Sequence, residues 1–149
     1  MKLSKTSGEV IVTHALGSCI GVAIHDPVAC VGGILHYMLP RSNVDPDKAR
    51  QKPCMFGDTG IPLLFQEAYR LGAAKQNLRV VIAGGAQVFA QKDFFVIGKR
   101  NTVIARKIFW KNKIMIAAEH VGDHIPRTLY LEIGSGDTWF TSHGERVDL

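Results

Sequence analysis

The sequence lacks the features that mark several large classes of protein. No apolar run approaches the roughly 18 residues that a membrane-spanning helix needs, and residues 1–7 contain no apolar core of a secretory signal. No repeat, low-complexity tract or interdomain linker interrupts the chain. We therefore expect one cytoplasmic domain over residues 1–149 that does not insert into a membrane.

Cysteine is scarce, and its pattern argues against both disulfides and zinc. The chain contains three separated cysteines and no CxxC pair, namely Cys19, Cys30 and Cys54. An odd number of isolated thiols is typical of a protein in a reducing compartment. His120 and His124 have the spacing of two metal ligands on a helix, but Gly122 and Pro126 predict a loop there. We expect no bound metal.

A dinucleotide-binding fingerprint is also missing, because Gly84 and Gly85 do not belong to a GxGxxG motif. We expect no organic cofactor and interpret this glycine pair as a tight turn that lines a pocket. The remaining composition is that of an ordinary globular protein, with 46% hydrophobic and 21% charged residues. A chain of this length buries roughly two thirds of the surface that its unfolded form exposes, so it can form a core without covalent cross-links.

Positive charge is concentrated in one segment. The whole chain carries a net charge of +5, whereas residues 92–113 contain seven cationic side chains against Asp93 alone, a net +6. The seven are Lys92, Lys99, Arg100, Arg106, Lys107, Lys111 and Lys113. Such a segment suits an acidic partner, which could be nucleic acid, a membrane surface or a protein. We favour the simpler explanation, in which the segment is the solvated face of a surface helix and only aids solubility.

Hydrophobic periodicity predicts a mixed α/β domain with about six or seven strands and two helices. We expect strands over residues 9–12, 19–25, 31–39, 78–83, 114–118, 128–133 and 137–141. Residues 41–53 are polar and contain Pro46 and Pro53, so we expect a mobile loop there. The first helix should be capped by Asp58 or Thr59 and end at Gly72.

The second helix should begin with Asn101 as its cap and run to about Lys111. Its core-facing side should consist of Ile104, Ala105, Ile108 and Phe109. Its outward side combines cationic and apolar residues, namely Val103, Arg106, Lys107, Trp110 and Lys111. We expect this outward side to dock a partner, unless Trp110 lies beneath the lysine stems or a neighbouring strand.

The stretch Thr13-His-Ala-Leu-Gly-Ser-Cys19 predicts an accessible thiol. Cys19 directly follows a turn that contains Gly17, so exposed backbone N–H groups should lie beside its sulfur, as a nucleophile and its oxyanion require. A free thiol has a pKa near 8.5 and therefore needs a basic partner at neutral pH.

Hairpin geometry suggests that His36 is this partner. A loop at Pro27–Val28, or at Asp26–Ala29, would pair Cys19 with His36 on adjacent strands, and directly opposite residues share a face of the sheet. A slip of one residue would place His36 on the other face. From pattern alone, a cysteine and a histidine in apolar strands are also consistent with ordinary core residues.

At these residues the sequence resembles the CheD family of chemoreceptor glutamine deamidases. Residues 13–26, THALGSCIGVAIHD, resemble the family's opening signature. Further motifs follow in the family's order, namely GGILHYMLP at 32–40, DTGIPLL at 58–64, GGAQ at 84–87 and IGKRN at 97–101. The sequence departs from the family in residues 121–127, and its short lead-in before Val10 predicts that a first edge strand is missing.

The resemblance implies that a chemoreceptor glutamine is hydrolysed through a thioester on Cys19, with His36 as acid and base and Thr13 orienting the imidazole. We take the backbone around Gly17 and Ser18 as the candidate oxyanion site. The resemblance also implies a layered, sandwich-like α/β fold similar to the catalytic domain of cytotoxic necrotizing factor toxins. It implies receptor cytoplasmic domains and a CheC-type phosphatase as partners, and we expect a monomer.

Two other functions compete with this one. A non-catalytic or weakly catalytic adaptor would bind and regulate a CheC-type phosphatase without substantial deamidation, although the intact Thr13, Cys19 and His36 favour catalysis. A nucleic-acid-binding protein would use the basic segment, but no aromatic-basic ribbon or known motif supports it, so we expect no nucleic-acid partner.

Overall fold

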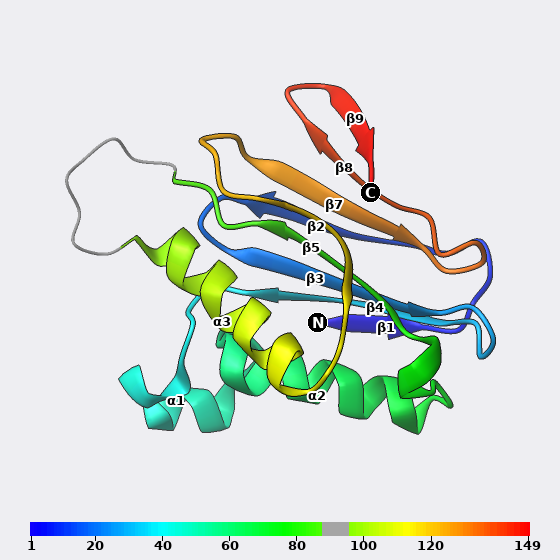
Figure 1. Cartoon of the computed structure of the whole chain (residues 1–149), viewed down its shortest axis with the longest axis horizontal. Helices are drawn as coiled ribbons and strands as arrows, with labels where there is room; N and C mark the ends of the chain where they lie inside the picture. Colours follow the sequence, from blue (N-terminus) through cyan, green and yellow to red (C-terminus); the bar gives the residue numbers. More distant parts are fainter. Residues whose placement is uncertain (88–95) are drawn as a thin grey trace.

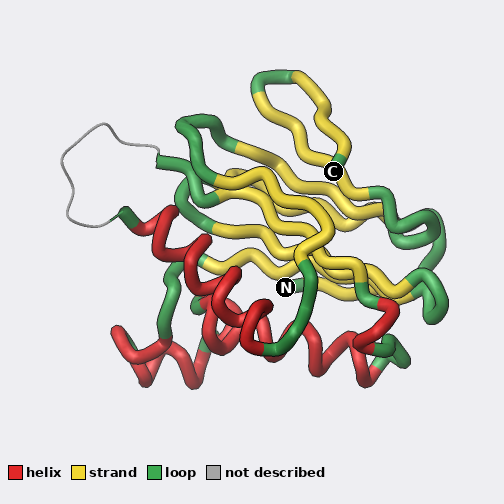
Figure 2. Tube along the Cα trace, viewed as in Figure 1, coloured by secondary structure: helices red, strands yellow, loops and turns green. Residues whose placement is uncertain are grey.

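The computed structural model describes residues 1–87 and 96–149 and consists of three layers. A five-stranded sheet forms the middle layer, a four-stranded sheet packs on one face of it, and helices cover the other face (Figure 1; Figure 2). The predicted mixed α/β class, with a pair of sheets flanked by helices, is confirmed. No helix among the described residues is both long and apolar enough to cross a bilayer.

Strands and helices alternate irregularly along the chain. The strands are β1 (Lys2–Ser4), β2 (Val10–Leu16), β3 (Ile20–Asp26), β4 (Val31–Tyr37), β5 (Arg79–Gly84), β6 (Ile116–Val121), β7 (Arg127–Glu132), β8 (Thr138–Ser142) and β9 (Glu145–Asp148). The helices are α1 (Pro46–Gln51), α2 (Gly57–Arg70) and α3 (Ile97–Lys111). Short 3-10 turns are η1 (Ser42–Val44), η2 (Pro53–Met55) and η3 (Lys75–Asn77).

The chain changes sheets between β2 and β3. The middle sheet has the order β1-β4-β3-β5-β6, and the second sheet has the order β2-β7-β8-β9. Residues 17–19 form the bend that joins β2 of one sheet to β3 of the other. The segment that contains Cys19 therefore lies at one end of the sandwich, where the two sheets meet.

Each face of the middle sheet contributes to a separate core. Alternate residues of β3 point in opposite directions, so Val22 and Ile24 pack against the helices while Ala23 packs between the sheets. Gly21 lies on the inter-sheet face, where an added Cβ would stand 2.9 Å from side-chain atoms of Leu16 and Leu129. Small residues on this face let the two sheets pack closely.

Residues 41–53 were predicted to be a loop, and this prediction is wrong. The segment contains η1 and α1 and runs into η2. The carboxylate of Asp45 accepts a hydrogen bond from the backbone N–H of Lys48 at 3.0 Å, and Pro46 occupies the first position of α1. Both are start signals for a helix, so this polar stretch is ordered by its own capping.

Two strands at sheet edges were also missed. The lead-in before Val10 was expected to lack a first edge strand, yet β1 pairs with β4, with Leu3 opposite Gly33. An added Cβ on Gly33 would stand 2.7 Å from Cγ of Leu3, so the glycine leaves room for this short strand. At the opposite end of the chain, β9 pairs with β8.

The predicted caps of both longer helices are wrong. In α2 the first residue is Gly57, and the carboxylate of Asp58 instead accepts from the backbone N–H and hydroxyl of Ser42. The Thr59 hydroxyl donates to the Pro53 carbonyl at 2.6 Å. In α3 the helix begins one turn before Asn101, which is a buried interior residue. These polar side chains make tertiary contacts rather than local caps.

The outward side of α3 is as predicted. Ile104, Ala105 and Phe109 are buried, whereas Val103 is 53% exposed and Trp110 is 78% exposed. The alternative in which Trp110 is covered by lysine stems or a strand is therefore wrong. Of the basic segment, Lys92 and Asp93 lie outside the described residues.

Candidate active site

The bend at residues 17–19 is fixed by hydrogen bonds to its three consecutive carbonyl groups. The Gly17 carbonyl accepts from the backbone N–H of Ala86 at 2.8 Å, and the Cys19 carbonyl accepts from that of Gly85 at 2.8 Å. Between them, the Ser18 carbonyl accepts from Nδ2 of Asn101 at 2.9 Å. The carbonyls are thus turned toward the loop after β5 and toward α3.

The glycine pair after β5 makes this bracing possible. Gly84 has a φ of +111°, and an added Cβ would stand 2.2 Å from the Cys19 carbonyl oxygen. Gly85 has a φ of +65°, and an added Cβ there would collide with the Thr102 hydroxyl. Only glycine combines this backbone conformation with so close an approach. The predicted tight turn thus lies directly against the backbone of the candidate nucleophile.

With its carbonyls held, the bend leaves two amide groups available. Within residues 1–87 and 96–149, the backbone N–H groups of Ser18 and Cys19 donate to no acceptor on another residue. The Gly17 N–H, in contrast, donates to the Ala15 carbonyl at 2.9 Å. The available donors are therefore those of Ser18 and Cys19, and Gly17 contributes the turn rather than a donor.

Asn101, which was predicted to be a helix cap, instead braces the bend from inside α3. Its Nδ2 donates to the Ser18 carbonyl and also, at 2.9 Å, to the carbonyl of Met38, just beyond the end of β4. The Tyr37 hydroxyl donates to the Asn101 carbonyl at 2.6 Å. One buried asparagine therefore ties the bend that contains Cys19 to the strand that contains His36.

The predicted strand register is wrong by two residues. His36 pairs with Gly21, and Cys19 precedes the paired region. The hairpin loop is Pro27–Cys30, one residue further along the chain than the predicted Asp26–Ala29, and Asp26 Oδ1 accepts the N–H groups of Val28 and Ala29 at 2.8 and 3.0 Å. A shift of two residues preserves the face of a strand, so His36 still lies on the inter-sheet face.

Thr13 approaches His36 from the other sheet. The Thr13 hydroxyl lies 2.9 Å from Nδ1 of His36. Directly after Thr13, the pairing of β2 with β7 is interrupted by a bulge, and Ala15 has a φ of +58°. Bulges of this kind re-aim neighbouring side chains. The contact requires both sheets, because Thr13 belongs to β2 and His36 to β4.

Cys19 and His36 lie at the same end of the inter-sheet space. Cys19 packs against the inter-sheet core. His36 lies on the same face of β4 as Ile34, whose side chain is part of this core. Both side chains are half-buried, and in the described part of the chain no hydrogen bond joins them. Catalytic hydrogen bonds are often long in substrate-free enzymes and shorten when substrate binds.

Burial favours the neutral form of both groups. It raises the pKa of the Cys19 thiol, which the Cys19 backbone N–H offsets only in part. Burial also lowers the pKa of the His36 imidazole. The substrate-free site therefore contains a thiol and a neutral imidazole rather than a thiolate–imidazolium pair.

The other two cysteines and the pair His120 and His124 lie outside this site. Cys30 ends the β3–β4 loop, and Cys54 lies in η2. His120 accepts a hydrogen bond from Arg127 at 2.8 Å, and His124 Nδ1 contacts the Gln87 carbonyl at 2.7 Å. Among the described residues, no cluster of three or more Cys, His, Asp or Glu side chains could hold a metal ion.

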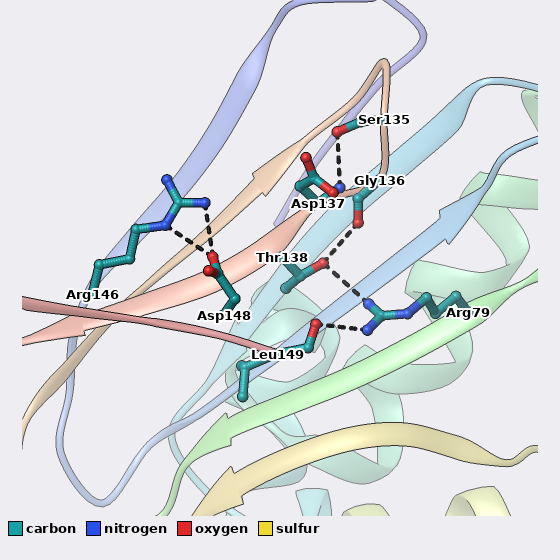
Figure 3. Close-up of a pocket in the computed structure, with 8 residues that line it drawn as sticks. All are labelled: Arg79, Ser135, Gly136, Asp137, Thr138, Arg146, Asp148 and Leu149. Carbon is teal, nitrogen blue, oxygen red and sulfur yellow. Dashed lines mark hydrogen bonds and ion pairs between the residues drawn. The ribbon is translucent and has the colours of Figure 1, made fainter.

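A cavity lies at the opposite end of the sandwich from Cys19 (Figure 3). It has a volume of about 380 Å³. Within it, the Arg79 guanidinium donates to the Leu149 carbonyl and to the Thr138 hydroxyl (Figure 3). Arg79 begins β5, whereas Gly84 at the other end of β5 contacts Cys19, a separation of roughly 17 Å along the strand. The cavity contains neither cysteine nor histidine, so it is separate from the thiol site.

Comparisons with known proteins extend over most of the chain. A family model described as CheD chemotactic sensory transduction matches residues 38–142. The chain is 51% identical over 143 residues to "Probable chemoreceptor glutamine deamidase CheD 1" of Syntrophus aciditrophicus, covering 96% of this chain and 89% of that protein. It is 48% identical over 141 residues to "Probable chemoreceptor glutamine deamidase CheD" of Solibacter usitatus, covering 95% of this chain and 83% of that protein. It is 41% identical over 137 residues to the protein of the same name in Desulforamulus reducens, covering 90% of this chain and 81% of that protein.

The substitution Asn101→Ala should lower the free energy of unfolding by roughly 2–4 kcal/mol, because two carbonyl groups lose their donor. Urea denaturation measures this change, and hydrogen exchange should show faster exchange at the Gly85 and Ala86 amides, which donate to the bend. Asn112→Ala is the matched control, because its side chain makes one exposed hydrogen bond at the end of α3. An Asn101 variant that resembled this control in both measurements would contradict the proposed tie.

The rate at which iodoacetamide alkylates Cys19 should rise with pH through a midpoint above about 8.5, since burial disfavours the thiolate. Peptide mapping by mass spectrometry across a pH series gives the rate at this residue separately from Cys30 and Cys54. A midpoint below neutral pH would instead reveal a preformed thiolate–imidazolium pair and contradict the neutral resting state.

Proposed function

This chain belongs to the CheD family, and we propose that it hydrolyses the side-chain amide of glutamine in chemoreceptors to give glutamate and ammonia. It is a protein-glutamine glutaminase of bacterial chemotaxis, like the relatives whose names state this activity. We assign its chemistry to the site formed by Thr13, Cys19 and His36. The observation that best supports this assignment is the hydrogen bond between Thr13 and His36, which joins the two sheets beside the only cysteine of the bend.

Thr13 sets the tautomer of the base. When the Thr13 hydroxyl oxygen accepts from Nδ1–H of His36, the proton of the neutral imidazole resides on Nδ1. The Nε2 lone pair is then available to take a proton. As the glutamine amide enters, Cys19 Sγ comes within reach of Nε2, transfers its proton there, and attacks the amide carbon.

The developing oxyanion is held by the available N–H groups of Ser18 and Cys19. These donors are fixed before the reaction because the three carbonyls of the bend are already bonded. Donors that need no rearrangement at the moment of reaction provide the largest electrostatic benefit. The role predicted for Gly17 is limited to the turn.

Collapse of the tetrahedral intermediate breaks the carbon–nitrogen bond. His36 returns its proton to the departing nitrogen, so ammonia leaves and a thioester remains on Cys19. A water molecule then gives a proton to Nε2 and attacks the thioester carbonyl. The second collapse regenerates the thiol with the proton from His36 and leaves glutamate on the receptor.

Several finer features accompany this proposal. We propose that residues 1–149 form a single domain whose fold resembles the catalytic domain of cytotoxic necrotizing factor toxins. We further propose that the protein acts in the cytoplasm as a monomer and that a CheC-type phosphatase is a partner. The resemblance of the sequence motifs to the family supports the fold and the CheC-type partner.

The test of the activity is mass spectrometry of a receptor cytoplasmic fragment after incubation with the full chain. Deamidation converts glutamine to glutamate, and the corresponding mass gain at a glutamine identifies the enzyme. A fragment that stays unmodified while a CheC-type phosphatase binds tightly would favour the adaptor function instead.

Replacement of Cys19 by alanine or serine should abolish deamidation without unfolding the protein. Alanine removes the nucleophile, and serine needs a far stronger base to ionise at neutral pH. Ammonia release measures activity, and circular dichroism verifies the fold. Cys30→Ala is the control because it removes a thiol outside the site. Near-normal ammonia release by Cys19→Ala would contradict the thioester mechanism.

A further inference from the structure

A groove runs beside the outward face of α3. Its volume is about 480 Å³, and it lies between the start of α3 and the segment that follows β4. Its apolar lining includes Val44, which is 65% exposed, and Val103, which is 53% exposed. Two apolar side chains thus remain in contact with solvent across one concave surface.

The groove is strongly cationic. Arg41, Lys99, Arg100 and Lys107 line it, and no acidic residue does. The whole of α3 contains no Asp or Glu. Of the helix's other cations, Arg106 is engaged by Glu119 of β6, so the charge that faces outward is concentrated on the groove side.

Asn101 connects this groove to the chemistry. It directly follows Arg100, and its amide holds both the Ser18 carbonyl in the bend and the Met38 carbonyl at the end of β4. The groove therefore begins on the same turn of α3 that braces the nucleophile.

We propose that this groove docks an acidic amphipathic helix of the chemoreceptor, next to the glutamine that is deamidated. The inference rests on the proposed function for the identity of the substrate. Carboxylates of the docked helix pair with the lysine and arginine side chains, and its apolar side chains cover Val44 and Val103. Complementary charge of this kind speeds association and fixes orientation.

The form of the surface favours a helix. Val103, Lys107 and Trp110 follow one another at intervals of four and three residues, so they form one stripe along α3. A second helix packs along such a stripe with its own row of side chains. Trp110 is 78% exposed and extends the stripe beyond the groove.

A protein helix fits these features better than nucleic acid does. The lining of the groove is aliphatic and has no aromatic ring. Single-stranded nucleic acid is bound by stacking bases on aromatic side chains, whereas an aliphatic floor with a cationic rim matches the anatomy of a protein interface.

The test compares the receptor cytoplasmic fragment with a short peptide that carries the same glutamine. The double variant Val103→Asp with Lys107→Glu should raise KM for the fragment about tenfold or more, with kcat retained. The short peptide does not reach the groove, so its kcat/KM should stay within about twofold of wild type. Raised salt should weaken the binding of wild type more than that of the variant.

Lys113→Glu is the matched control, because it reverses a charge just after α3 and outside the groove. An unchanged KM for the fragment in the double variant would overturn the proposal. An equal loss on fragment and peptide would also overturn it, since the variant would then act on the thiol site. Displacement of the fragment from wild type by duplex DNA, with the double variant failing to bind that DNA, would assign the groove to nucleic acid instead.

Binding is measured separately from turnover so that the two proposals can fail independently. If the wild-type protein binds the fragment but does not deamidate it, and the double variant binds at least tenfold more weakly, docking stands and the proposed activity fails. If the fragment is deamidated and the double variant matches wild type in both KM and binding, the activity stands and docking fails.

Discussion

The two hydrogen bonds donated by the buried amide of Asn101 are the constraint on which the site depends. One reaches the Ser18 carbonyl beside Cys19, and the other reaches the Met38 carbonyl beyond the strand that contains His36. They join the nucleophile bend to the end of the histidine strand through a single side chain. Because Asn101 lies inside α3, the position of this helix is transmitted directly to the backbone of the candidate nucleophile.

The site also depends on the close packing of two sheets. Thr13 belongs to the outer sheet and His36 to the middle sheet, so their hydrogen bond forms only when the inter-sheet core is intact. Gly21 lets the sheets approach, and Gly84 lets the turn after β5 lie against Cys19. Catalysis in this arrangement requires no charged resting pair, because burial keeps thiol and imidazole neutral until an amide arrives.

Local sequence patterns predicted the strands and the faces of their residues, which follow from apolar alternation. They missed the features that tertiary contacts determine, such as the hairpin register and the role of Asn101. The alternation of apolar residues located β3 and β4 and placed His36 on the correct face. The register itself was wrong, because the loop that the Asp26 side chain stabilises lies one residue further along the chain than the turn pattern indicated. Asn101 resembled a helix cap, since the same amide serves either purpose and only the fold shows which carbonyls it meets. Asp45 and Pro46 did carry a helix signal, but the polar composition around them indicated a loop.

The central claim is that the inter-sheet end of the molecule forms one covalent site centred on Cys19. It is tested most directly with a receptor peptide in which a chloromethyl ketone replaces the amide of the target glutamine. Peptide mapping should find the label on Cys19 alone, blocked by unmodified substrate and greatly slowed when Thr13→Val removes the partner of His36 Nδ1. Labelling confined to Cys30 or Cys54, or labelling of Cys19 that is indifferent to both substrate and Thr13→Val, would contradict the account.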